Sequence, residues 1–142
     1  MHQDKLVSTD GSGPHEGCSV SLSANGNTLV VGGNFDTSGI GASWIFVRSS
    51  LGVWSQQGLK FVGTDAISIA EQGSSVYISG DGNSFVTGGP QDDSGTGACW
   101  IFTRSGENWY QQGSKLIVTG TSGPANAGNA VSLSANGNTM VV

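Results

Sequence analysis

The sequence predicts an all-β fold, built as an array of four-stranded antiparallel units of the β-propeller blade type. Residues 19–33 read SVSLSANGNTLVVGG, residues 75–89 read SVYISGDGNSFVTGG, and residues 130–142 read AVSLSANGNTMVV, so the units start 56 and then 55 residues apart. A period of this length indicates supersecondary units that bury their apolar faces against one another. Each complete period carries four strand patterns and no pattern typical of a helix, as a propeller blade requires.

The first strand and its turn open each unit. Val20 and Leu22 alternate with serines over residues 19–23, which is typical of a strand with one apolar face. The residues ANGN (24–27) follow, and Asn-Gly is the strongest short hairpin signal because both residues tolerate positive φ. The same turn is expected at Asp81-Gly82 and at Asn136-Gly137.

The second to fourth strands carry most of the large apolar residues. The second strand, residues 28–31, has consecutive apolar residues, which predicts burial on both faces, and Gly32-Gly33 is expected to end it. A polar loop leads to an aromatic third strand at 42–48 and to a fourth strand at 54–62, broken near Gly58. The predicted array, 1–142, then comprises a strand tail (5–9), two whole units (18–63 and 75–119) and a partial unit (130–142).

Two other β architectures fit the sequence less well. A β-sandwich accounts for the short strands but not for the regular period of 55 to 56 residues. A β-helix needs a much shorter repeat. In a propeller, small residues suit the innermost strand, where units converge, and the serine-rich first strand and the tryptophans of the third and fourth strands follow that gradient.

The composition argues against several classes of binding partner. The formal net charge is −5, with five basic residues, none of them adjacent, which argues against binding nucleic acid and against docking on anionic membranes. No apolar run is long enough to span a bilayer, and the first residues show no apolar core of a signal peptide. Only 11% of residues are charged, so Ser, Gly and Asn supply the polar surface, and an extracellular or cell-surface location is expected.

The residue pattern contains no enzyme signature. No Ser-His-Asp order, nucleophile elbow or phosphate-binding loop is present, so the protein is predicted not to be an enzyme. Cys18 and Cys99 lie at positions that the repeat does not conserve between units, and two unpaired thiols are expected. Isolated Cys and His residues also lack the spacing of a metal site.

The order of motifs resembles a known repeat family. A small-residue strand, an Asp/Asn-Gly turn, an apolar strand ending in Gly88-Gly89-Pro90 and an aromatic strand beginning Trp100-Ile-Phe occur in succession. This order is similar to the FG-GAP β-propeller repeats of the integrin α-subunit head and of many bacterial surface proteins. The family binds calcium in an aspartate-rich loop between the first two strands. Here that loop holds one acid, Asp81, so no cofactor is expected, and calcium is disfavoured because it requires several carboxylates.

Two groups of residues are candidate ligand contacts. We recognise one recurring acidic position, in the loop after the second strand (34–41 and 90–97), at Asp36 in the first unit and Asp92 and Asp93 in the second. These acids either bind a ligand or ion or only solvate the loop and form Asx turns. Exposed tryptophans can stack on sugars, whereas buried ones pack between units. The tryptophans to which this applies are Trp54 and Trp109.

The phase of the repeat suggests how the chain works. Both ends of the chain fall inside a unit, which leaves strand edges open to pairing. Either other copies complete these units by strand exchange, as a homo-oligomeric ring or filament, or the chain is an excerpt of a longer array. The function predicted first is therefore structural self-assembly, and the alternative is a glycan- or protein-binding propeller module. The predicted assembly edges are Lys5, Leu6, Val7, Thr139, Met140, Val141 and Val142.

Overall fold

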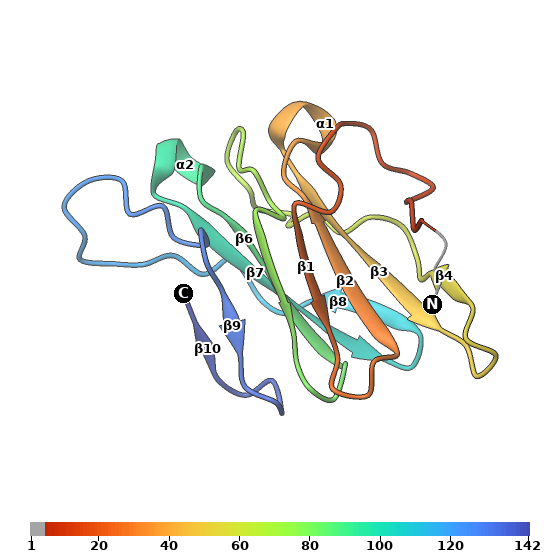
Figure 1. The fold of residues 1–142 in the computed structure, drawn as a ribbon. Helices are drawn as coiled ribbons and strands as arrows, with labels where there is room; N and C mark the ends of the chain where they lie inside the picture. The colour runs from red at the N-terminus through yellow and green to blue at the C-terminus, as the bar shows by residue number, and fades with distance from the viewer. Residues whose placement is uncertain (1–4) are drawn as a thin grey trace.

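The computed structural model describes residues 5–142, so the first four residues of the predicted array lie outside it. The described chain forms three antiparallel sheets and confirms the all-β prediction (Figure 1). Sheet 1 has the order β1 (Ser19–Leu22), β2 (Thr28–Gly33), β3 (Ala42–Arg48), β4 (Trp54–Gln56). Sheet 2 repeats it with β5 (Ser75–Ile78), β6 (Ser84–Gly89), β7 (Ala98–Ser105) and β8 (Asn108–Gln111). Sheet 3 contains β9 (Ser132–Leu133) and β10 (Met140–Val141).

The hairpin between the first two strands of each sheet has the expected register. Leu22 pairs with Leu29, and the Ser23 N–H donates to the Thr28 carbonyl at 2.9 Å, which leaves residues 24–27 (ANGN) as the turn. Gly26 takes a positive φ of 69° in this turn. The second strand runs further than predicted: pairing with β3 continues through Gly32 and Gly33. The glycines do not end the strand, because their backbone still pairs with β3. Their lack of a side chain instead lets the Gly73 backbone approach Gly32 closely.

The fourth strand is interrupted where the sequence predicted a break. β4 ends at Gln56, the chain bulges through Gly58 (φ 78°), and Phe61 then returns to pair with Ser43 of β3. The second unit repeats this bridge between Leu116 and Cys99. The bulge lets the chain leave the sheet and rejoin it, so that Phe61 enters the space between sheets 1 and 2.

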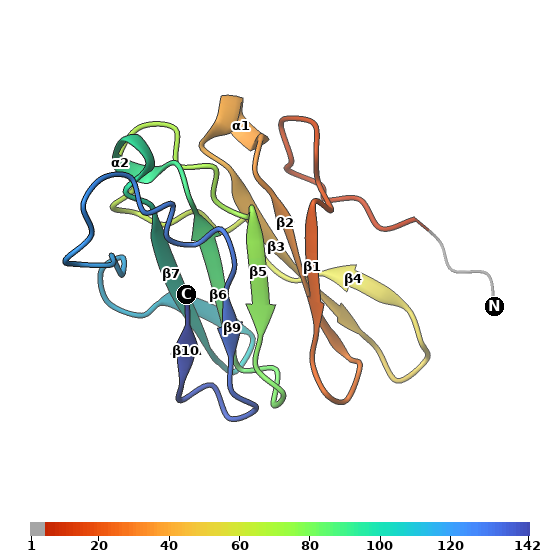
Figure 2. The same cartoon turned by 60° about the vertical axis from the view of Figure 1, so that its left-hand side comes forward.

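Sheets 1 and 2 pack face to face around the main core. Val30 and Ile45 project from sheet 1 into a cluster that includes Phe85 and Phe102 of sheet 2, whose rings stack with centroids 4.9 Å apart. Sheet 3 covers part of the opposite face of sheet 2, mainly through Leu133. The first strands β1, β5 and β9 therefore follow one another across the molecule (Figure 2).

A linker joins each sheet to the next and contacts the strands of both. Gln72, just before β5, makes a parallel bridge with Gly41, just before β3. Ala127 and Gly97 make the same bridge one unit later. This repeated contact attaches the start of each sheet to its neighbour at one end.

The two loops that were expected to be irregular each contain a single helical turn, α1 (Asp36–Gly39) and α2 (Asp92–Gly95). Two residues inside each turn have left-handed backbone, Thr37 and Ser38 in α1 and Asp93 and Ser94 in α2. Both turns lie on the same side of the molecule, opposite the hairpin turns (Figure 1). Left-handed non-glycine residues are uncommon, so their recurrence at equivalent positions indicates that the unit as a whole imposes this turn.

Candidate functional site

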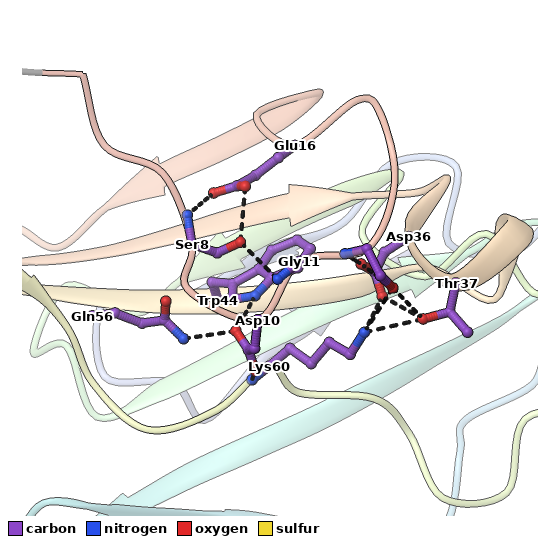
Figure 3. Close-up of polar contacts among 10 residues, drawn as sticks. Ser8, Asp10, Gly11, Glu16, Asp36, Thr37, Trp44, Gln56 and Lys60 are labelled. Atoms are coloured by element: carbon purple, nitrogen blue, oxygen red, sulfur yellow. Dashed lines mark hydrogen bonds and ion pairs between the residues drawn. The ribbon is translucent and has the colours of Figure 1, made fainter.

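A polar cluster attaches the segment before β1 to sheet 1 (Figure 3). The Asp10 carboxylate accepts hydrogen bonds from Trp44 Nε1 (3.0 Å), Gln56 Nε2 (2.9 Å) and the Lys60 backbone N–H (2.7 Å). These donors come from β3, from β4 and from the bulge that follows β4. One carboxylate therefore joins three segments of the sheet to the linker that precedes it.

The second unit contains the same cluster around Asp65. Its carboxylate accepts from Trp100 Nε1 (2.8 Å), Gln111 Nε2 (3.3 Å) and the Lys115 backbone N–H (2.7 Å). Asp10 and Asp65 lie 55 residues apart, each after a threonine, so they form a second recurring acidic position. This position was not among the predicted contacts, although Thr-Asp recurs five residues after a lysine in both units and was visible in the sequence.

Asp36 and Asp92, predicted as candidate ligand contacts, are buried and paired with lysines. Lys60 Nζ lies 2.5 Å from Asp36 Oδ2, and Lys115 Nζ lies 2.5 Å from Asp92 Oδ2. The other carboxylate oxygen of Asp36 accepts the Ser12 backbone N–H at 2.6 Å (Figure 3). Each lysine thus binds two aspartates, one through its backbone and one through its ammonium group, and these carboxylates are used within the fold.

The other predicted contact residues differ in their surroundings. Asp93 is exposed and is one of the two left-handed residues of α2. Trp54 is half-buried, with the Arg48 guanidinium 5.8 Å from its ring centroid. Trp109 packs between sheets, edge-on to Phe85 at 5.2 Å, and donates its indole N–H to Gln57 Oε1 at 3.0 Å. Of the candidate ligand residues, Asp93 has the most accessible side chain.

The hairpin turns use their side-chain oxygens internally. Asn25 Oδ1 accepts from Ser23 Oγ (2.9 Å) and from the Asn27 backbone N–H (3.0 Å). Asp81 Oδ1 accepts from the equivalent groups of Ser79 (2.5 Å) and Asn83 (3.0 Å). Within residues 5–142, no group of three or more His, Cys, Asp or Glu side chains could hold a metal ion.

The carboxyl groups of Asp10, Asp36 and Asp65 have pKa values below the ordinary value of 3.8. Burial alone would raise the pKa of Asp65, but hydrogen bonds from the Lys115 backbone, Trp100 and Gln111 outweigh it. The same balance lowers the pKa of Asp10 and of Asp36, with Lys60 contributing to both. Because the folded state holds these carboxylates ionised, their stabilisation is complete above their unfolded pKa and is lost as the pH falls through the folded one.

We therefore expect the free energy of unfolding to change little between about pH 7 and pH 5 and to fall below about pH 4. Urea unfolding midpoints measured across this range test the prediction. An Asp65→Asn variant should be less stable at neutral pH and should lose less stability on acidification, because it lacks one of the titrating groups. A midpoint that does not fall by about pH 3 would contradict this account.

The predicted assembly edges occupy opposite ends of the described chain. Leu6 packs on the outer side of sheet 1 with Val31, Trp44 and Phe46, while Val7 is exposed. Residues 5–9 form no strand, although the sequence predicted a strand tail there. They lie against the sheet face, where Lys5, Leu6 and Val7 line a groove of about 270 Å³.

At the other end, β10 pairs with β9 along one edge and has no strand on its other edge among the described residues. Met140 packs toward sheet 2. Val141 and Val142 are exposed, and Thr139 lies at the surface where the hairpin enters β10.

Equivalent residues differ sharply in exposure between the middle and the ends of the array. Val30 and Val86 are both 0% exposed, but the equivalent Val141 is 66% exposed. Val20 is 61% exposed, whereas its equivalent Val76 is 7% exposed. Leu22 is likewise exposed, and its equivalents Ile78 and Leu133 are buried. The two ends of the array therefore expose side chains that a neighbouring sheet covers in the middle.

A scan against protein-family models finds no match for this chain, and no curated protein matches it. In the described part of the chain, neither helix is both long and apolar enough to pass through a bilayer.

Proposed function

We propose that this protein is a non-enzymatic structural module of β-propeller type, resembling FG-GAP repeats, that assembles with other copies into a ring or filament outside the cell or at its surface. In this proposal, sheets 1 and 2 act as whole blades and sheet 3 as part of a third. The observation that carries it is the exposure, at both ends of the array, of apolar positions that are buried between the sheets.

The repeat supports association with a copy of the same chain. Sheet 1 already packs on sheet 2, and sheet 2 on sheet 3, through equivalent positions. Each sheet therefore carries positions that pack against an equivalent sheet. Heterologous contacts of this kind generate rings when the rotation closes and filaments when it does not.

Recognition of a glycan or protein is the alternative. It would use the loops that contain α1 and α2, which lie on one side of the molecule (Figure 1). It has less support, because Asp36 and Asp92 are neutralised by Lys60 and Lys115 and Trp109 packs between the sheets. Asp93 and Trp54 remain as accessible or partly accessible contacts.

The assembly state of the purified chain tests the proposal. Light scattering and electron microscopy are expected to show particles larger than a monomer, because exposed apolar faces associate in water. A Val141→Asp variant should shift the distribution toward the monomer. Leu51→Asp is the matched control, since Leu51 is exposed in the β3–β4 turn, outside the strands β1, β9 and β10. A wild-type chain that stays monomeric at high concentration would overturn the proposal.

A further inference from the structure

We propose that the copies associate head to tail, with the outer face of sheet 1 in one copy packed against the outer face of sheet 3 in the next. The inference rests on the proposed self-assembly and specifies its partner surface and its direction. We define the first-strand face by Val20 and Leu22 of β1, and the last-strand face by Ser132 of β9 and Val141 of β10. Both sets of residues are exposed.

The contacts between sheets inside the chain provide the template. Val30 of β2 shares a buried cluster with Val76 and Ile78 of β5. One unit later, Val86 of β6 shares a cluster with Leu133 of β9. In both places, a second-strand valine of one sheet packs with the first strand of the following sheet, so the contact has a direction.

The two end faces carry the unused halves of this contact. Val141 is the third member of the series Val30, Val86, and its 66% exposure shows that no described residue covers it. Val20 and Leu22 are the first members of the first-strand series, and they also lack a covering sheet. The last-strand face therefore carries the second-strand valine of this contact, and the first-strand face carries the first-strand residues that pack against it. Two identical faces would not reproduce the contact.

The groove on the outer side of sheet 1 fits the same arrangement. It has a volume of about 270 Å³, and Val31 and Phe46 line it together with residues of the N-terminal segment. The equivalent residues of sheet 2, Thr87 and Phe102, face sheet 1, and Thr87 Oγ1 lies 2.9 Å from Ser43 Oγ. Leu6 covers Val31 and Phe46 there, as Phe61 packs on Phe102 between sheets 1 and 2, but no sheet of the described chain lies beyond Leu6.

A polar contact gives the join its register. Inside the chain, the Ile78 backbone N–H donates to Ser21 Oγ across the sheets, at 3.1 Å. Leu22 is the residue equivalent to Ile78, and Ser132 is the residue equivalent to Ser21. In the proposed join, the Leu22 N–H of one copy donates to Ser132 Oγ of the preceding copy, in the same direction as the valine contact.

Mixing two variants, each blocked on one face, tests the direction. Val20→Asp blocks the first-strand face, and Val141→Asp blocks the last-strand face. A carboxylate buried without a partner should weaken the join on the order of 100-fold. Each variant alone is expected to be monomeric by light scattering, while an equimolar mixture should form one-to-one dimers through the two intact faces and nothing larger.

The controls separate this inference from the proposed function. Both substitutions are at exposed sites, and far-ultraviolet circular dichroism verifies folding; Leu22→Asp and Ser132→Arg block the same faces from other positions. Dimers of the Val141→Asp variant alone would show that first-strand faces pair with each other, which overturns the head-to-tail direction but keeps self-assembly. A mixture that stays monomeric, beside a wild type that assembles, also overturns the direction. A monomeric wild type refutes self-assembly itself.

Discussion

Replacing Asp92 with alanine is expected to lower the free energy of unfolding by about 4 kcal/mol, because it leaves the ammonium group of Lys115 without its partner. The Asp92 side chain is 0% exposed, and the Lys115 side chain is 15% exposed. The substitution also removes the acceptor of the Ile67 backbone N–H, which lies 2.6 Å from Asp92 Oδ1. Urea unfolding followed by tryptophan fluorescence measures the loss.

The double variant Asp92→Leu with Lys115→Met isolates the cause. Replacing both charges with apolar groups removes the unpaired ammonium, so this variant should recover most of the stability that the single substitution loses. Asp93→Ala is the matched control at the adjacent, exposed position and should change the free energy of unfolding by about 0.5 kcal/mol or less. Equal losses at Asp92 and Asp93 would refute the account.

Gly88→Ala is expected to destabilise the fold by about 3 kcal/mol, because the added methyl group would collide with backbone rather than with a movable side chain. A Cβ at Gly88 would overlap the carbonyl oxygen of Gly128, in the linker before β9, and approach Ser75 Oγ to 2.6 Å. Relieving that overlap requires sheets 2 and 3 to separate at this point. Chemical unfolding measures the loss of stability.

Gly80→Ala provides the comparison for this prediction. Gly80 also faces sheet 3, but the nearest atom to its added Cβ would be the Ala135 carbonyl oxygen at 3.1 Å, so a small shift accommodates it. A smaller loss is expected there. If both variants lost the same amount, the close approach at Gly88 would not be what matters, and the loss would reflect a property that the two glycines share.

The strands and turns of each unit could be predicted because they depend on local patterns. The alternation of Val20 and Leu22 with serines predicts the strand β1, and Asn25-Gly26 specifies the tight hairpin that follows. The break near Gly58 was visible as well. The prediction that Gly32-Gly33 ends β2 was wrong, because a glycine pair signals close approach as well as a strand end.

The role of the acids could not be predicted in the same way. Asp36 and Asp92 lie in polar loops, where a carboxylate is ordinarily solvated. Their burial depends on Lys60 and Lys115, which follow more than twenty residues later and reach them only when the bulge after the fourth strand folds back. The recurrence of Asp10 and Asp65 was present in the sequence, but its meaning comes from the three donors that converge on each.

The class of fold, the length of the repeat and the order of strands in each unit follow from the amino-acid pattern, because periodicity and turn chemistry act over a few neighbouring residues. Which equivalent residues are covered depends on the packing of the sheets, since Val30, Val86 and Val141 occupy the same position in the repeat and differ in whether a sheet lies beyond them. Burial is a property of the neighbouring sheet, and for that reason the two exposed end faces emerged only from the folded chain.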